Sequence, residues 1–275
     1  MVDIVVPVHD AFESLRECLG SLSRTVPVNQ SIEIIDDAST DARVWPLIEE
    51  FASTRSGVRT VRQPQNLGFV QTVNGAMRRS RFDVILLNSD TITTRGWLEA
   101  MQRCAASDPR IATVTPFSNN AEICSFPEFC VNNPVPRDPE RVAATIRLAA
   151  SRSYPDLPTA VGFCMLVRRR CLDQLGLFDA ERYGAGYGEE NDFCMRASQA
   201  GFRNVLCDDA YVVHLGGQSF LPKGLAPGGE NMAKLLERYP EYQALVADFI
   251  RRDPIRQLRE NILARQPCGE GQNPG

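Results

Sequence analysis

The chain has 275 residues, with 30 Lys and Arg against 34 Asp and Glu, a formal net charge of −4 and 43% hydrophobic residues. These values are ordinary for a globular protein, and the negative charge argues against nucleic-acid binding, which needs a basic face. No apolar run approaches the ~18 residues of a membrane span, and no basic segment precedes the first apolar run. We therefore expect a protein that is neither secreted nor membrane-spanning.

The chain contains nine cysteines, an odd number, and no C-x-x-C pair. This pattern argues against a zinc ribbon and against a disulfide framework. Most of the cysteines lie in apolar contexts such as residues 162–166, where a thiol behaves as a small hydrophobic group. We expect reduced thiols and a cytoplasmic protein.

The first third of the chain alternates short β-branched runs with segments of helical periodicity. Val2–Val8 is a predicted strand, and apolar residues from Phe12 to Leu22 follow it at helical spacing. The alternation continues with predicted strands at 32–35, 58–61 and 84–87, and with predicted helices around 47–51 and 69–77. This order predicts an α/β fold with a mostly parallel sheet and helices on both faces. Ligands of such sheets bind beyond the carboxyl ends of the strands.

The later part of the chain has less regular patterns. Residues 113–139 are rich in Pro and Asn and predict a long loop across the active face. Strands are predicted at 161–167 and 204–213, the second ending at His214. Residues 230–265 contain helical segments broken at Pro240 and Pro254. We expect these last helices to pack on a partner domain, on a membrane surface or on the chain's own sheet.

Two carboxylates follow the second predicted strand in a polar turn. Capping of the next helix is the structural explanation for such residues, and we favour it for Ser39 and Asp41. A carboxylate at a strand end can also accept the imide N–H of uracil or thymine, which a neutral group does less strongly. We favour this nucleobase role for Asp36, which Asp37 directly follows.

Asn88-Ser89-Asp90-Thr91 directly follows the fourth predicted strand. Turns are rich in these residue types, so the tetrapeptide alone is a weak signal. A single carboxylate projecting from such a turn can hold Mg²⁺ or Mn²⁺ while diphosphate oxygens and waters fill the other positions. Its place behind an apolar strand leaves an ordinary turn and a metal site equally open for Asp90.

The Gly-rich residues 184–188 lead into a predicted helix with three carboxylates at its start, Glu189, Glu190 and Asp192. Acidic groups in a first turn stabilise the helix dipole, which is the structural explanation. Asp192 and Arg196 have the spacing of an i,i+4 ion pair, and we expect that pair to be structural. Glu190 points away from it, so its carboxylate is free to act on a substrate, and the glycines allow a close approach.

The chain has only two histidines. His9 follows the first predicted strand, where we expect it to line a nucleotide pocket. His214 ends the late strand just before two glycines. A lone histidine is more often a packed residue, but a strand end is also a suitable place for a metal ligand. The spacing alone leaves both roles open for His214.

Several segments occur in an order that is more specific than any of them alone. They are Pro7-Val8-His9, Ile35-Asp36-Asp37-Ala38-Ser39-Thr40-Asp41, Asn66-Leu67-Gly68-Phe69, Leu86-Leu87-Asn88-Ser89-Asp90-Thr91 and Tyr187-Gly188-Glu189-Glu190-Asn191-Asp192. Over about residues 2–220 this order resembles family 2 glycosyltransferases of the GT-A fold, of the bacterial polysaccharide or O-antigen type. The resemblance implies an inverting hexosyltransferase that uses a nucleotide-diphosphate sugar and Mn²⁺ or Mg²⁺.

The resemblance also implies a set of binding residues. Asp36 matches the acid that binds the nucleobase, and Asp90 matches the last residue of the metal-binding D-x-D motif, whose first position is Asn88 here. His214 matches the histidine that completes the metal site. The implied nucleotide site comprises Pro7, Val8, His9, Asp36, Asp37, Asn66, Asn88 and Ser89.

Glu190 matches the second acid of the family's E-D pair, the catalytic base, with Glu in place of the usual Asp. Asp192 is the alternative position for this base. The implied base deprotonates an acceptor hydroxyl, which attacks the anomeric carbon from the face opposite the diphosphate and inverts its configuration. The Q-x-x-R-W motif of processive synthases is absent, which favours transfer of one sugar or a few.

The resemblance predicts a domain at 1–225, with a nucleotide-binding half at 1–115 and an acceptor-binding half at 116–225, and a helical extension at 226–275. The expected donor is a sugar nucleotide of the UDP or dTDP type. The expected acceptor is a hydroxyl of a glycan or a lipid-linked glycan. We expect a cytoplasmic protein with contacts to the inner face of the membrane or to other transferase domains, and with no nucleic-acid partner.

Three other functions compete with this one. An NAD-dependent oxidoreductase needs a Gly-rich turn after the first strand, and Pro7-Val8-His9-Asp10 offers none. A sugar nucleotidyltransferase would have a Gly-rich loop with Arg and Lys near its start, which is missing. A module that binds nucleotide or glycan without turnover would lack Asp90, Glu190 or His214, and all three are present.

Overall fold

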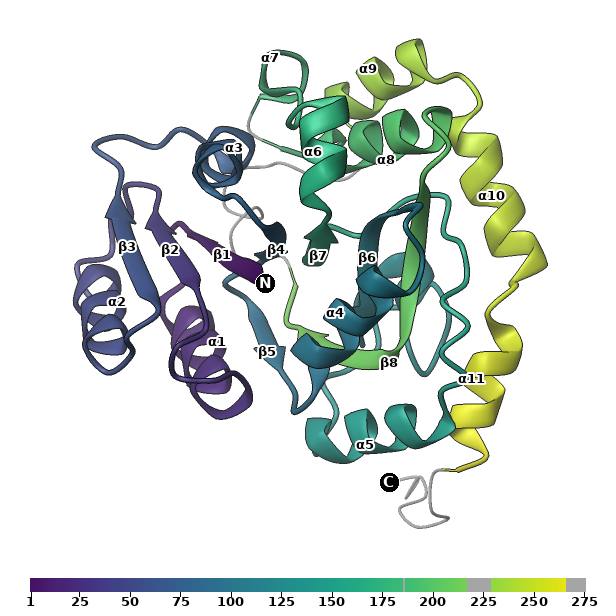
Figure 1. Ribbon diagram of the computed structural model, residues 1–275, viewed down its shortest axis with the longest axis horizontal. Coiled ribbons are helices and arrows are strands. Elements are labelled where there is room, and N and C mark those ends of the chain that lie inside the picture. Colours follow the sequence, from purple (N-terminus) through teal and green to yellow (C-terminus); the bar gives the residue numbers. More distant parts are fainter. Residues whose placement is uncertain (185, 217–228, 266–275) are drawn as a thin grey trace, which may run out of the picture.

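The computed structural model describes residues 1–184, 186–216 and 229–265. Within these ranges eight strands form one sheet in the order β3-β2-β1-β4-β7-β6-β8-β5 (Figure 1). The strands are β1 (Val2–Val8), β2 (Ile32–Asp36), β3 (Val58–Arg62), β4 (Asp83–Leu87), β5 (Thr91–Thr93), β6 (Ile111–Phe117), β7 (Cys164–Val167) and β8 (Arg203–His214). The helices up to β8 are α1 (Phe12–Thr25), α2 (Val44–Ser53), α3 (Phe69–Arg79), α4 (Trp97–Ser107), the short 3₁₀ helix η1 (Glu122–Cys124), α5 (Pro139–Ala149), α6 (Arg169–Leu175), α7 (Ala180–Tyr183) and α8 (Glu189–Gln199).

The first four strands form the parallel array that the alternating pattern predicts. β1 lies between β2 and β4 and is parallel to both, and β3 is parallel to β2. Val8 pairs with Asp36, so the carboxyl ends of β1 and β2 lie side by side. The predicted α/β fold is therefore confirmed, and the polar residues that follow these strands share one edge of the sheet.

The second half of the sheet is more complex than the predicted array. β7 is antiparallel to β4 and to β6, and β5 is antiparallel to β8. The prediction of a loop from residue 113 is wrong for its first five positions, because residues 111–117 form β6 within the sheet. Every residue of β6 is buried, so its Thr and Pro residues pack inside the protein, and the loop begins only after Phe117.

Alternate residues of β1 face opposite sides of the sheet, as a strand requires. Ile4 and Val6 join an apolar cluster with residues of α1, α2, α4 and α5. Val5 joins a second cluster with residues of α3, α6 and α8. Helices therefore cover both faces of the sheet (Figure 1), as predicted.

Three helices follow β8 in the described ranges: α9 (Glu230–Arg238), α10 (Tyr242–Arg252) and α11 (Arg256–Leu263). Pro240 and Pro254 lie between them, which confirms the predicted breaks. The helices run along one edge of the molecule in Figure 1, where α9 packs on α7 and α11 packs on α5. They thus contact the body of the same chain. Residues 226–228 and 266–275 of the expected extension lie outside the described ranges.

The cysteines in the described part of the chain are free thiols, and all of them except Cys130 are buried. Cys268 lies outside that part. Among the described helices, none combines the length and the apolar character that crossing a membrane requires.

Candidate functional site

Asp36 ends β2, and its side chain is fully buried. Oδ1 accepts a hydrogen bond from the backbone N–H of Ser39 at 2.8 Å. Oδ2 lies 3.2 Å from Nε of Arg62 in an ion pair, but no group in the described ranges donates a hydrogen bond to it. A buried carboxylate oxygen without a donor is costly. Asp36 therefore keeps an acceptor that suits the N–H group of a ligand.

Asp37 has the opposite situation, because both of its carboxylate oxygens are used inside the protein. Oδ1 accepts from the backbone N–H of Leu67 at 2.8 Å, and Oδ2 accepts from that of Gly68 at 2.9 Å. Gly68 has φ +82°, a conformation that glycine adopts without strain, and it begins α3. Asp37 thus holds the loop before α3 against the end of β2.

His9 and Asn66 lie over the same strand ends. Nδ1 of His9 is 3.0 Å from the backbone oxygen of Asp37, and Nδ2 of Asn66 is 3.1 Å from the imidazole nitrogens. Pro7 is partly exposed, but the side chain of Val8 packs in the core, so Val8 can offer a ligand only its backbone. The structure therefore brings the expected nucleotide residues at 7–9, 36–37 and 66 together at one edge.

Asp90 and His214 meet where β5 pairs with β8. Thr91 is opposite His214 in this antiparallel pair, and the backbone N–H of Leu215 donates to the carbonyl oxygen of Asp90 at 2.9 Å. Nε2 of His214 lies 3.5 Å from Oδ1 of Asp90. We expected the two side chains to converge because the ends of parallel strands share one edge of a sheet, and β8 does run in the same direction as β4. The return of β5 beside β8 then brings the two side chains into contact.

The hydrogen bond of Nδ1 sets the orientation of the His214 ring. Nδ1 lies 2.8 Å from the backbone oxygen of Asn120, which can only accept, so Nδ1 carries a proton and donates it. The ring also stacks on Phe163, with 5.2 Å between centroids. Nε2 then points toward Asp90, the arrangement in which a histidine ligates a metal while its second nitrogen is held by a carbonyl.

The space between Asp90 and His214 favours a cation. Burial lowers the pKa of His214, but the hydrogen bond and the charge of Asp90 raise it, and the net pKa lies above its usual value. In the neutral imidazole, Nε2 points its lone pair toward the carboxylate of Asp90, and the two electron-rich groups repel each other. A cation bound between them would stabilise this arrangement. One carboxylate oxygen and one imidazole nitrogen form a donor set that suits Mn²⁺. In the described part of the chain no third His, Cys, Asp or Glu joins them in a metal-binding group.

The turn that carries Asp90 is tightly held. The backbone N–H of Asn88 donates to the carbonyl of Phe163 at 2.9 Å, and the carbonyl of Asn88 accepts from the hydroxyl of Thr91 at 2.7 Å. Ser89 is buried beside it. The backbone of Asn88 is thus used for structure.

Glu190 lies in the first turn of α8, which begins after the left-handed Gly188. Its Oε2 accepts from the backbone N–H of Gly188 and its Oε1 from Nδ2 of Asn191, both at 3.3 Å. Gly162, which precedes β7, lies beside this side chain, since a Cβ atom placed on it would be 3.8 Å from Cγ of Glu190. Burial raises the pKa of Glu190, as a base poised to take a proton requires.

Glu189 is a second buried carboxyl group beside Glu190. Its side chain is almost fully buried, and its Oε2 has no hydrogen-bond partner in the described ranges. Burial, followed by the charge of Glu190, raises the pKa of Glu189 well above its usual value. Glu190, which accepts two hydrogen bonds, is therefore the group of the two that ionises more readily.

Asp192 forms the predicted ion pair with Arg196, with Oδ2 at 2.7 Å from Nε. Its Oδ1 accepts from Arg238 at 2.9 Å and from the hydroxyl of Tyr239 at 3.1 Å. The carboxylate is fully buried. Both oxygens of Asp192 are thus used by structural partners, two of which are arginines.

Several residues that hold this site were missed by sequence reasoning. Asn119 pairs with both backbone groups of His214: its Oδ1 accepts from the N–H at 2.9 Å and its Nδ2 donates to the carbonyl at 3.1 Å. Asn120 holds the His214 ring, and Asn191 contacts Glu190. The high content of Asn after Phe117 is the sequence feature that could have pointed to these residues. It indicated only that a loop lies near the site.

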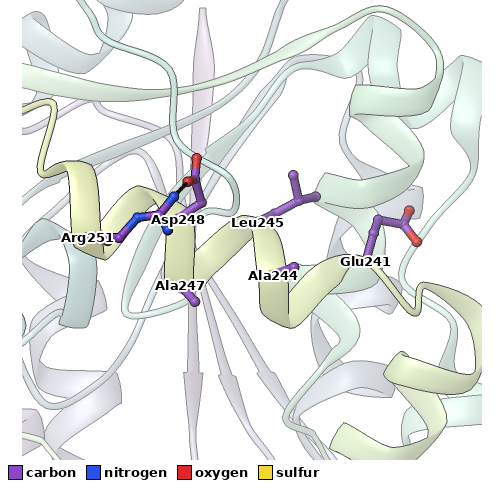
Figure 2. A pocket seen from close by; sticks show the side chains of 6 residues that line it. All are labelled: Glu241, Ala244, Leu245, Ala247, Asp248 and Arg251. Atoms are coloured by element: carbon purple, nitrogen blue, oxygen red, sulfur yellow. Dashed lines mark hydrogen bonds and ion pairs between the residues drawn. The ribbon is translucent and has the colours of Figure 1, made fainter.

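An open hollow of about 520 Å³ lies along α10. Figure 2 shows the side chains that line it. The hollow is lined by Glu241, Ala244, Leu245, Ala247, Asp248 and Arg251, all from α10 and the residue before it. Arg251 is paired with Asp248 inside the hollow. None of the candidate site residues contributes to this surface, so the chemistry at the sheet edge lies elsewhere.

Comparisons with known proteins agree with this geometry. Residues 3–176 match the family model described as glycosyl transferase family 2. The pre-mycofactocin glycosyltransferase of Mycobacterium tuberculosis is 27% identical over 220 residues, which cover 78% of this chain and 42% of the relative. The N-acetylglucosaminyl-diphospho-decaprenol L-rhamnosyltransferase of the same species is 26% identical over 239 residues, which cover 78% of this chain and 76% of the relative. The chain thus spans less than half the length of some curated relatives that it matches.

Solved structures share the fold. The crystal structure of GalNAc-T7 with UDP, GalNAc and Mn²⁺ superposes with a TM-score of 0.64 at 16% identity, covering 97% of this chain and 58% of that chain. At this identity the likeness shows the fold alone. The predicted GT-A fold is confirmed.

Proposed function

Because the chain belongs to glycosyltransferase family 2, we propose that it is a metal-dependent inverting transferase that moves a sugar from a UDP- or dTDP-type donor to a hydroxyl of a glycan or lipid-linked glycan. The observation that carries the proposal is the pairing of Asp90 with His214 at the sheet edge that also bears Asp36. These residues offer groups for a metal and for a nucleobase, and Glu190 offers a base.

The donor set at Asp90 and His214 fits a divalent ion. Oδ1 of Asp90 and Nε2 of His214 would be its protein ligands, and diphosphate oxygens and waters would complete the coordination. When bound, the ion stabilises negative charge that develops on the leaving diphosphate. The imidazole ligand favours Mn²⁺ over Mg²⁺. The Mn²⁺ in the GalNAc-T7 structure supports this assignment.

The nucleotide would lie over the ends of β1 and β2. Oδ2 of Asp36, which lacks a hydrogen-bond donor in the described ranges, would accept the imide N–H of uracil or thymine. His9 and Asn66 would line the pocket, and the residues from Asn88 to Asp90 would face the diphosphate. The UDP in the GalNAc-T7 structure supports a uridine nucleotide.

Glu190 would be the catalytic base. Its carboxylate takes the proton of the acceptor hydroxyl, and that oxygen attacks the anomeric carbon from the face opposite the diphosphate. The C–O bond to the diphosphate breaks as the new C–O bond forms, so the configuration inverts without a covalent enzyme intermediate. Asp192 remains the alternative position for the base.

The acceptor would belong to polysaccharide or O-antigen synthesis. The rhamnosyltransferase relative from M. tuberculosis is named for a lipid-diphosphate-linked sugar, which supports a lipid-linked glycan. We propose that this protein acts in the cytoplasm, at the inner face of the membrane. We propose residues 1–225 as the transferase domain, with halves at 1–115 and 116–225, and residues 226–275 as its extension.

A donor screen tests the proposal against the non-catalytic alternative. The protein is incubated with UDP-, dTDP- and GDP-sugars, with MnCl₂ or with EDTA, and hydrolysis or transfer is detected by mass spectrometry. We expect release of UDP or dTDP that requires Mn²⁺. Tight nucleotide binding by calorimetry without turnover of any donor would favour a binding module.

A further inference from the structure

The C-terminal helices hold the turn of α8 that carries Glu190. Arg238 of α9 and Tyr239, which follows it, both donate to Oδ1 of Asp192. Nδ2 of Asn231 in α9 donates to the carbonyls of Tyr183 and Gly186, at 2.8 and 2.7 Å, in the segment before α8. Apolar parts of α8, α9 and α10 pack in one buried cluster. These helices lie beyond residues 3–176, which match the family model.

Asn191 receives a hydrogen bond from α10. The hydroxyls of Tyr242 and Thr159 both lie 2.7 Å from its Oδ1. An amide oxygen only accepts, so both hydroxyls donate to it in this orientation, and the Thr159 hydroxyl also lies 3.1 Å from the carbonyl oxygen of Ala160. A hydroxyl could equally accept from an amide nitrogen, so the ionised carboxylate of Glu190, which only accepts, decides which end of the amide is the nitrogen. The amide nitrogen therefore faces the opposite way, where Nδ2 donates to Oε1 of Glu190 at 3.3 Å.

Glu190 lies among several titratable groups, and burial opposes its ionisation. The titratable groups that act on it or face it are Glu189 and Cys194 of α8, Glu122 of η1, Tyr187 of the preceding segment and Tyr242 of α10. Burial and the charge of Glu122 raise the pKa of Glu190. Donors to a carboxylate favour its charged form. The N–H groups of Gly188 and Asn191 are such donors, one on each oxygen.

We propose that Asn191 is a positioning residue for Glu190, and that Tyr242 of α10 fixes the Asn191 amide so that its N–H group faces the carboxylate. The C-terminal helices are then part of the catalytic unit. Rotation of the amide would turn its oxygen toward Glu190 and disfavour the ionised base. The inference rests on the proposed role of Glu190.

The proton affinity of Glu190 tests the contact without any substrate. The full chain is labelled with ¹³Cδ-glutamate, the Glu190 signal is assigned by its loss in Glu190→Gln, and its pH titration is followed by NMR. Asn191→Asp keeps the oxygen that accepts from Thr159 and Tyr242 but replaces the Nδ2 donor by a second, negatively charged oxygen. We expect the proton affinity of Glu190 to rise about tenfold or more. The acid limb of the pH profile of kcat/KM should move to higher pH by the corresponding amount, about one pH unit for a tenfold change in proton affinity.

Two further variants test the part assigned to α10. Tyr242→Phe removes one of the hydroxyls that orient Asn191, so the proton affinity of Glu190 should rise by a smaller factor. Tyr239→Phe is the matched control, because it removes a phenol from the same cluster that bonds Asp192 instead. We expect it to leave the titration of Glu190 unchanged. The double variant Thr159→Val/Tyr242→Phe keeps Asn191 but removes both hydroxyls that donate to its Oδ1, so the amide can rotate. This variant tests the same claim if Asn191→Asp fails to fold.

An unchanged titration in the folded Asn191→Asp protein, or in the double variant, would overturn the inference. Equal shifts in Tyr239→Phe and Tyr242→Phe would overturn the role of α10, since they would report a general loosening of the cluster. The proposed function fails separately. Turnover by Glu190→Gln would remove Glu190 as the base, whereas the titration reports on Asn191 alone.

Discussion

Nε2 of His214 lies 3.5 Å from Oδ1 of Asp90, although the two residues are far apart in the sequence. The antiparallel pairing of β5 with β8 brings them together, and the Asn120 carbonyl turns the imidazole toward the carboxylate. The short edge strand β5 thus holds the turn after β4 against the end of β8.

His214→Ala should raise the Mn²⁺ concentration needed for turnover by at least tenfold, because one of two protein ligands is lost. Mn²⁺ binding in the presence of UDP is followed by electron paramagnetic resonance, and activity is measured against MnCl₂. Phe163→Leu is the control, since it removes the stacking partner of His214 and leaves both ligands. A folded His214→Ala protein with unchanged metal dependence would remove His214 from the metal site.

Asp36→Ala should weaken binding of UDP or dTDP by ~1–3 kcal/mol, the cost of a missing charged hydrogen-bond partner. Calorimetry measures the affinity directly. Asp41→Ala is a suitable control, because this neighbouring carboxylate is paired with exposed Arg43 instead. Equal affinities of wild type and Asp36→Ala would place the nucleobase elsewhere.

The pH dependence of kcat/KM should show a base whose pKa lies above the usual value of a glutamate, ~4.3. Burial raises the pKa of Glu190, and only the ionised form accepts a proton, so activity rises as pH increases through that pKa. Protonation of His214 also lowers activity, but that loss shifts with Mn²⁺ concentration. An acid limb of the pH profile that does not depend on the Mn²⁺ concentration, and that is lost when Glu190 is replaced, identifies Glu190 as the base. A single Mn²⁺-dependent limb would argue against this assignment.

Asp192→Asn should destabilise the protein by about 3 kcal/mol, because it removes the fully buried charge that pairs with part-buried Arg196 and with exposed Arg238. Denaturant unfolding measures this change. The folded fraction should keep much of its turnover, since Glu190 is intact. A stable but inactive Asp192→Asn protein would instead move the catalytic base to Asp192.

The local pattern of apolar and polar residues was sufficient to predict the parallel half of the sheet. β1, β2 and β4 are apolar runs with polar turns behind them, so the rule that parallel strand ends share an edge placed Asp36 and Asp90 correctly on one side. The i,i+4 spacing was sufficient to predict the pair of Asp192 with Arg196. Both predictions depend on contacts within a few residues or on one general rule of topology.

Contacts between distant segments were not predictable in this way. Thr113 and Pro116 suggested a loop because their residue types are common in turns, yet burial between β7 and β8 makes that segment a strand. No periodicity indicates that Asn119 bonds the backbone of His214 or that Tyr242 reaches Asn191. Such polar contacts are decided by tertiary packing.

The central claim is that Glu190 takes the proton of the acceptor, and Glu190→Gln tests it most directly. The amide keeps the shape of the side chain but cannot accept a proton at neutral pH. With the donor found in the screen, we predict that Glu190→Gln binds UDP or dTDP and Mn²⁺ as the wild type does while kcat falls by at least ~10²-fold. A Glu190→Gln protein that keeps most of its transfer activity would contradict the account.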